Sequence, residues 1–182
     1  MKPLALGIIA GVILGLIAGF FTGTIYSPTS TQPVTTDQSQ VIGIYFSPDG
    51  GCENAVITWI NRANSTIHIL IYSFTLDSIG NALLSAHERG LEIKTVFEKS
   101  QISQYSEYQR LRSAGVNVRN DTNPDYMHNK VMIIDDKIVL TGSFNWSTNA
   151  QENNNENLIV IQSTSAANAF DNNFQTIWNE SI

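Results

Sequence analysis

The sequence predicts an α/β fold: a mixed β-sheet flanked by helices on both faces, preceded by one N-terminal transmembrane helix. Over residues 41–119, β-branched apolar runs typical of strands alternate with amphipathic runs typical of helices. Over residues 129–161, strand-like runs follow one another directly, and a helical pattern then ends the chain. Such an order predicts parallel and antiparallel neighbours in one sheet, with helices on its two faces.

Composition narrows the function classes. The chain has 182 residues, a formal net charge of −6 and an apolar fraction of 42%. These values indicate one folded domain with an appendage, and they exclude a protein that coats nucleic acid through an extended basic surface. Cys52 is the single cysteine, which excludes an intrachain disulfide and a cysteine-rich zinc site. We expect Cys52 to be a small buried residue in the first turn of a helix.

An uncleaved membrane anchor is predicted for residues 1–26. Residues 4–25 carry no charge, and about twenty such residues span a bilayer, whereas a signal-peptide core runs to about 7–15. Lys2 precedes this span and no Lys or Arg follows before Arg62, so the domain is expected outside the cytoplasm at the cell membrane. The alternative is cleavage of this segment as a signal peptide, which would give a secreted or periplasmic protein.

Residues 27–40 are predicted to be a flexible linker, because Ser, Thr, Gln and Pro predominate there without apolar periodicity. Within the anchor, glycine recurs at every fourth residue from Gly7 to Gly23, a ridge that favours association of two anchor helices. The globular domain is assigned to residues 41–182.

Within the domain, strands are assigned from short β-branched or apolar runs, and helices from apolar residues three or four apart. Asp77 is predicted to cap one helix that ends at Gly90, Gly115 ends the next, and Ser163 caps the last. Strands are expected at residues 41–46, 66–74, 91–97, 116–119, 129–134, 137–141 and 158–161. Helices are expected at residues 53–63, 77–87 and 103–114, and after Ser163, where the buried residues are Ala167, Phe170, Phe174, Ile177 and Trp178.

Two polar runs joined by a hairpin carry the candidate chemistry. Side chains two residues apart on a strand share a face, so His128 and Lys130 project together, as do Ser143 and Asn145. If the hairpin pairs in simple register, these four side chains meet in one patch, where Gly142 permits a close approach of backbone.

This set of groups suits phosphoryl transfer. The imidazole of His128 can attack phosphorus and form a covalent intermediate, which divides one displacement into two easier steps. Lys130, Ser143 and Asn145 can bind the substrate by donating hydrogen bonds to the oxygens where charge accumulates. A carboxylate is still needed to fix the imidazole tautomer, and Glu156, just before a predicted strand, is the candidate.

The order His-x-Lys-x4-Asp followed by Gly-Ser-x-Asn resembles the signature of the phospholipase D superfamily. His128, Lys130, Asp135, Ser143 and Asn145 match it, together with Gly142. The segment 79–96 also looks like the corresponding part of small single-motif members, the bacterial phospholipase D-like endonuclease and the mitochondrial cardiolipin hydrolase/endonuclease. The resemblance covers residues 41–182. Asp135 lies at an odd offset from His128, so we expect it to point away and to cap the turn.

The resemblance implies further properties. Because this chain carries one motif where larger members carry two, it implies a homodimer with one shared site. One His128 would attack, and the second copy of the same residue would protonate the leaving oxygen. The resemblance also implies that Glu156 supports the histidine, and that neither a metal nor another cofactor is required. The three histidines of the chain are too scattered for a metal cluster.

Three functions remain open at this point. The first is an endonuclease acting on DNA or RNA, the second a phospholipase D acting on membrane phospholipid headgroups, and the third a non-catalytic membrane-anchored binding module. Asp121 and Asp125 would repel a polyanion, whereas a groove lined by basic residues would attract one. The residues that could form such a groove are Lys94, Lys99, Arg110, Arg112 and Arg119. Trp146 is either a substrate platform or a core residue.

Overall fold

The computed structural model describes residues 38–182 of the protein. The predicted anchor and residues 27–37 of the predicted linker lie outside this part of the chain. Among residues 38–182, every helix is too short or too polar to cross a bilayer. The first strand begins at Gln40, which is the last residue of the predicted linker.

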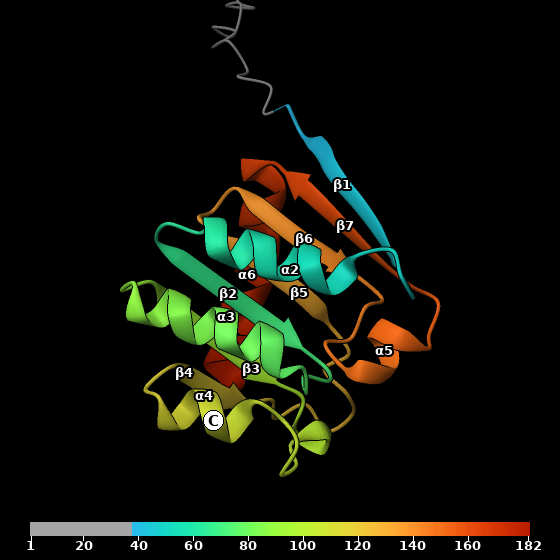
Figure 1. Ribbon diagram of the computed structural model, residues 1–182. Coiled ribbons are helices and arrows are strands. Elements are labelled where there is room, and N and C mark those ends of the chain that lie inside the picture. Colours follow the sequence, from blue (N-terminus) through green and yellow to red (C-terminus); the bar gives the residue numbers. More distant parts are fainter. Residues whose placement is uncertain (1–37) are drawn as a thin grey trace, which may run out of the picture. The chain divides into compact units, whose positions relative to one another are not determined.

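Within the described residues the strands form one seven-stranded mixed sheet, in the order β1-β7-β6-β5-β2-β3-β4 (Figure 1). β2, β3 and β4 run parallel to one another, and every other neighbouring pair is antiparallel. The predicted mixed sheet is therefore confirmed. The strands are β1 (Gln40–Ser47), β2 (Thr66–Ile71), β3 (Glu92–Phe97), β4 (Asn117–Asn120), β5 (Lys130–Ile134), β6 (Ile138–Gly142) and β7 (Glu156–Gln162).

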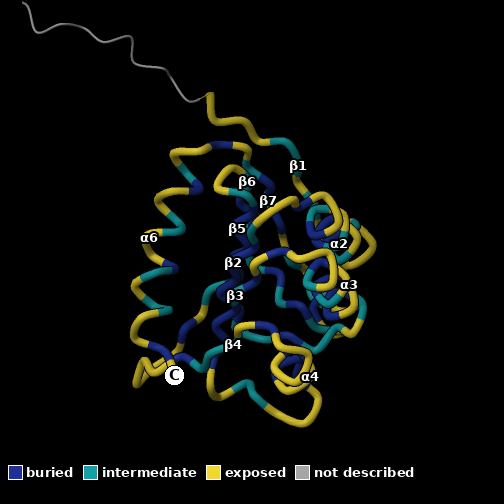
Figure 2. Tube along the Cα trace, turned by 90° about the vertical axis from the view of Figure 1, so that its left-hand side faces the viewer, coloured by how far each residue is buried: buried dark blue, intermediate teal, exposed yellow. Residues whose placement is uncertain are grey.

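Helices cover both faces of the sheet, as predicted: α2, α3 and α4 lie on one side and α6 on the other (Figure 2). The helices are α2 (Cys52–Arg62), α3 (Asp77–Glu88), α4 (Tyr108–Ser113), α5 (Thr148–Glu152) and α6 (Thr164–Glu180), with a 3-10 turn at η1 (Lys99–Gln101). Cys52 opens α2 and is fully buried, which confirms its expected place.

β5 shows how the sheet divides the core. Val131 and Ile133 pack on the α6 side with Phe174, whereas Met132 and Ile134 pack on the side of α2 and α3. Because strand side chains alternate between faces, a strand buried on both sides reads as a continuous apolar run. The end of this strand is consequently the place where polar groups can reach solvent.

The starts of two helices differ from the prediction, whereas the cap of a third agrees with it. Asp77 is the first residue of α3 rather than its cap, and Leu76 precedes it without a side-chain cap bond. The helix expected from residue 103 begins at Tyr108, because Ser106 Oγ donates to Ser103 O (2.9 Å) and holds a turn there. Ser163 does cap α6, since its hydroxyl accepts from Ala166 N (3.1 Å).

Candidate active site

The candidate site lies at one end of the sheet, where β2 and β6 stop and β5 and β7 start. Ile71 pairs with Lys130 across β2 and β5, and Gly142 pairs with Leu158 across β6 and β7. Because these neighbouring strands are antiparallel, the end of one lies beside the beginning of the next. Residues far apart in the chain therefore meet at this edge.

A pocket of about 440 Å³ at this edge brings the predicted residues together. It is lined by His128, Lys130, Gly142, Ser143, Asn145 and Glu156. Of the residues that the motif nominates, the structure therefore places Asp135 elsewhere and gathers the others into one cavity.

His128 is exposed and lies just before β5. Its ring stands at 62° to that of Tyr72, with 4.4 Å between the ring centroids. Its backbone oxygen accepts a hydrogen bond from Lys130 Nζ (2.9 Å). The imidazole thus packs against an aromatic neighbour and remains accessible to solvent.

Lys130 is buried, with 7% of its surface exposed, although it carries an ammonium group. Its Nζ lies 4.7 Å from the centroid of the Tyr72 ring, a cation–π contact. Burial lowers the pKa of Lys130 from 10.5 to about 8, against the opposing charge of Glu156. Tyr72, which touches both motif residues, was not predicted, because a tyrosine closing an apolar strand carries no signal of its own.

Ser143 and Asn145 sit on a loop that is bonded tightly to β7. Ser143 Oγ accepts from Asn157 N (3.1 Å), while Ser143 N and Phe144 N donate to Asn157 O (3.1 and 3.2 Å). A Cβ on Gly142 would lie 2.2 Å from Asn157 O, so this approach requires glycine. Asn145 Oδ1 is buried without a hydrogen-bond partner among the described residues.

Trp146 follows this loop and belongs to the core. It is 2% exposed, and its ring stands edge-on to Phe74 with 4.8 Å between centroids. Of the two roles that the sequence left open, the structure selects the core role.

Glu156 opens β7 and lines the pocket together with His128. Its Oε1 accepts a hydrogen bond from Asn154 Nδ2 (2.9 Å). The support that this carboxylate was expected to give to the imidazole of His128 therefore stays a prediction.

Asp135 lies at the opposite end of β5 from His128, in the turn to β6. Its carboxylate accepts from the backbone N–H groups of Asn64 (2.9 Å), Ser65 (2.8 Å) and Thr66 (3.0 Å). Burial raises the pKa of Asp135, but these bonds outweigh it and lower the pKa to about 2. The expected structural role in the turn agrees with this geometry.

The basic residues that could have formed a groove make separate contacts instead. Lys94 pairs with Glu92, and Arg110 pairs with Glu107 at 2.9 Å. In the described part of the chain, none of these five basic residues lines the pocket that His128 shares with Lys130. The remaining contacts are Arg112 over the Tyr108 ring (6.0 Å), Arg119 over the Trp178 ring (4.2 Å) and Lys99 Nζ with Asp125 O (3.4 Å).

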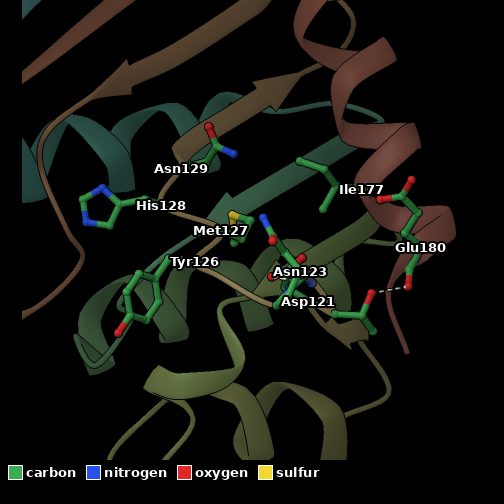
Figure 3. Close-up of a pocket in the computed structure, with 10 residues that line it drawn as sticks. Asp121, Asn123, Tyr126, Met127, His128, Asn129, Ile177 and Glu180 are labelled. Atoms are coloured by element: carbon green, nitrogen blue, oxygen red, sulfur yellow. Dashed lines mark hydrogen bonds between the residues drawn. The ribbon is translucent and has the colours of Figure 1, made fainter.

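A second pocket of about 520 Å³ adjoins His128 (Figure 3). It lies between the loop before β5 and α6, where Ile177 and Glu180 face Asn123 and Met127.

Metal-ligand clusters of three or more His, Cys, Asp or Glu side chains are absent from residues 38–182.

Comparisons with known proteins identify the family of this chain. Residues 56–178 match the family described as cardiolipin synthase, PLD-like domain. The mitochondrial cardiolipin hydrolase of Mus musculus is 34% identical over 119 residues, which are 65% of this chain and 54% of that protein. The phospholipase D of Rickettsia prowazekii is 35% identical over 126 residues, which are 69% of this chain and 62% of that protein. The aligned part thus spans less than two thirds of either relative.

Solved structures show the same fold. The phospholipase D family member Nuc from Salmonella typhimurium superposes with a TM-score of 0.75 and 32% identity, covering 80% of this chain and 97% of that one. NucT from Helicobacter pylori superposes with a TM-score of 0.72 and 28% identity, covering 80% of this chain and 99% of that one. The chain therefore belongs to the phospholipase D superfamily, through a PLD-like domain that carries the motif headed by His128.

Proposed function

We propose that this protein is a phosphodiesterase that hydrolyses internal phosphodiester bonds of DNA or RNA through a phosphohistidine, without a metal ion. The observation that carries the proposal is the pocket in which His128, Lys130, Ser143, Asn145 and Glu156 converge. It combines a nucleophile with hydrogen-bond donors around one small volume, which is the arrangement that phosphoryl transfer needs.

In the first step, a ring nitrogen of His128 attacks phosphorus, and the bond from phosphorus to the leaving oxygen breaks. An acid must give that oxygen a proton, and we assign this role to the second copy of His128 in a homodimer. In the second step, water attacks phosphorus, the nitrogen–phosphorus bond breaks, and the now neutral second imidazole accepts the proton from water. Both histidines return to their starting states.

The other pocket residues act on charge and orientation. Lys130 meets negative charge on the non-bridging oxygens, and its burial strengthens that interaction because little water screens it. The amide of Asn145 and the hydroxyl of Ser143 add hydrogen bonds to the same oxygens. Glu156 holds the imidazole tautomer that exposes a nucleophilic nitrogen.

A phospholipase D acting on membrane headgroups is the second candidate, and β1 favours it. Val41, Ile44 and Phe46 are apolar yet 55%, 59% and 58% exposed, and β1 directly follows the predicted linker to the anchor. Exposed apolar side chains of this kind can contact the apolar part of a lipid surface. The relatives named cardiolipin hydrolase and phospholipase D point the same way.

One experiment separates these candidates. Full-length protein in detergent is assayed in EDTA on single-stranded DNA, duplex DNA, RNA, and vesicles of cardiolipin or phosphatidylcholine. We expect cleavage of nucleic acid that survives chelation and disappears in His128→Ala, with the thermal unfolding curve unchanged. His87→Ala, on α3 away from the pocket, is the matched control and should retain full activity.

The remaining outcomes are distinct. Cleavage of lipid alone would favour the phospholipase, and binding without cleavage of any substrate would favour the non-catalytic module. Activity that requires an added divalent ion would overturn the metal-independent mechanism.

A further inference from the structure

A row of tyrosine rings extends from the candidate site toward solvent, outside the motif. Tyr72 lies 4.4 Å from the His128 ring, and Tyr126 stands edge-on to Tyr72 at 6.1 Å and 86°. Tyr126 is 63% exposed, so most of this large ring faces water. His128 and Tyr126 are two residues apart in the segment before β5, and both rings point to the same side of it (Figure 3).

The segment that carries Tyr126 is held from beneath by a buried carboxylate. Met127 N donates to Glu98 Oε2 (2.7 Å), and Glu98 is fully buried while Met127 is 3% exposed. On the other flank, Lys99 Nζ donates to Asp125 O (3.4 Å). Both neighbours of Tyr126 are therefore anchored, and the ring is presented outward on a supported segment.

Tyr72 is also fixed in place. Its hydroxyl accepts a hydrogen bond from Gln101 Nε2 (3.3 Å), and its ring makes a cation–π contact with the ammonium of Lys130. The row therefore joins the site of phosphoryl transfer to an exposed, preorganised aromatic face. Aromatic rings in such positions bind flat π-systems, and the flat group next to every phosphodiester in a nucleic acid is a base.

We propose that Tyr126 is a stacking platform for the base that flanks the scissile phosphate, and that the substrate is consequently single-stranded or locally unpaired. This inference rests on the proposed nuclease function. In a duplex both faces of each base are covered by neighbours, so only an unstacked base can lie on Tyr126. Because every base has a π-face, the platform is tolerant of sequence.

The test compares oligonucleotides that differ in one base. Full-length protein is given a single-stranded oligonucleotide with one cleavable linkage, or the same strand with an abasic residue beside that linkage. Loss of the base should lower kcat/KM about tenfold or more in the wild type, because stacking of a base on an aromatic side chain is of that size. In Tyr126→Ala the two strands should be cleaved at equal rates, both near the wild-type rate on the abasic strand.

Matched variants separate stacking from bulk effects. Tyr126→Phe keeps the ring and should behave as the wild type. Tyr105→Ala removes another exposed tyrosine, 74% exposed and lining a different pocket, and should change nothing. Of these three variants, only Tyr126→Ala should show a smaller preference than the wild type for single-stranded over duplex substrate.

Binding provides a readout that does not need turnover. In a His128→Ala background, 2-aminopurine at the flanking position should lose fluorescence on binding, and Tyr126→Ala should restore it. Equal quenching with and without the Tyr126 ring would overturn the platform while leaving the nuclease function intact. Lipid cleavage without oligonucleotide binding would instead remove the nuclease function. A lower sedimenting mass for Tyr126→Ala would assign the ring to a subunit contact and overturn the proposal.

Discussion

His128 and Lys130 share one pocket but differ in their access to water, and this difference separates their proposed roles. His128 is exposed, so a polymeric substrate can reach its ring, whereas Lys130 is 7% exposed and holds its charge in a poorly solvated place. A buried cation interacts more strongly with a developing anion than a solvated one does. The same burial brings the pKa of Lys130 to about 8, close enough to neutrality to affect activity.

Lys130 should set an alkaline limit on activity. The ammonium is present below its pKa, so kcat/KM should fall as the pH rises through about 8, where Lys130 loses its proton. Lys130→Met should lower kcat by roughly a hundredfold or more, because it removes a charge that acts in the transition state.

The pH–rate profiles of two further variants check this assignment. Lys130→Arg keeps its charge at high pH, so its residual activity should lack the limb near 8. Glu156→Gln removes a charge that raises the pKa of Lys130, so its limb should move to lower pH, whereas Glu152→Gln on α5 should leave it in place. A limb that persists in Lys130→Arg would belong to another group.

At the scale of elements, the site depends on how closely two strand ends approach. The loop after β6 lies on the start of β7, and Asn157 O receives both Ser143 N and Phe144 N. At the other end of β5, Asp135 ties the β5–β6 turn to the start of β2 through three backbone N–H groups. The β5–β6 hairpin is thus held by hydrogen bonds at both ends, and the candidate catalytic residues lie at only one of them.

Gly142→Ala should damage both stability and activity. Its new Cβ would lie 2.2 Å from Asn157 O, and relief requires β6 and β7 to separate where Ser143 is positioned. We expect a loss of about 1–3 kcal/mol in unfolding free energy and more than a tenfold loss of kcat/KM. Gly90→Ala is the control: it strains a residue at φ 91°, but open space surrounds it far from the site, so kcat should not change. Wild-type activity in Gly142→Ala would show that the loop tolerates displacement.

Asp135→Asn should destabilise the fold while leaving catalysis intact. The amide supplies one acceptor fewer to the backbone donors at 64–66, which should cost about 1–3 kcal/mol in a denaturant titration. Asp136→Asn, the exposed neighbour at φ 53°, should cost less than half as much, since asparagine tolerates that conformation.

Acid unfolding provides an independent check on Asp135. Its folded pKa of about 2 lies below the reference value of 3.8, so its stabilisation is present above pH 4 and is lost as the pH falls toward 2. The variant should lack this part of the acid transition. A large fall in kcat at a temperature where Asp135→Asn is fully folded would give this residue a part in catalysis.

At the scale of the whole molecule, the proposed mechanism needs a second histidine that the pocket of one chain does not supply. Within residues 38–182, the pocket is lined by one histidine. A two-fold contact beside His128 would bring the same residue from a second chain, because an isologous interface places identical groups together. The glycine ridge of the predicted anchor would raise the local concentration of the two domains.

Mixing experiments test the shared site. If both copies of His128 act in one site, wild-type homodimers alone are active after subunit exchange with His128→Ala. Specific activity should then follow the square of the wild-type fraction, so that equal mixing leaves about a quarter of the activity per total chain, against about a half for independent sites. Sedimentation of the same samples should give twice the chain mass. A linear dependence, or a fully active monomer, would require another acid within the chain.

The sequence by itself determined the mixed sheet, the helices on both faces and the residues of the pocket. Alternation of side chains along a strand is a local rule, so the spacing of His128 with Lys130 and of Ser143 with Asn145 already predicted a common face. Ser163 as a cap and Asp135 as a turn residue followed from equally local rules. Local rules predicted a helix at residues 103–107, but serine side chains hold a turn there instead.

Only the tertiary structure decided which further side chains contact the pocket residues and how much water reaches them. Tyr72 meets His128 because β2 pairs with β5, a contact between residues 56 positions apart that no local pattern records. Burial of Lys130 and Trp146, and the scattering of the basic residues among separate contacts, depend in the same way on packing between distant segments. Burial and pairing are properties of the assembled sheet, and a single segment specifies only the face that it can offer.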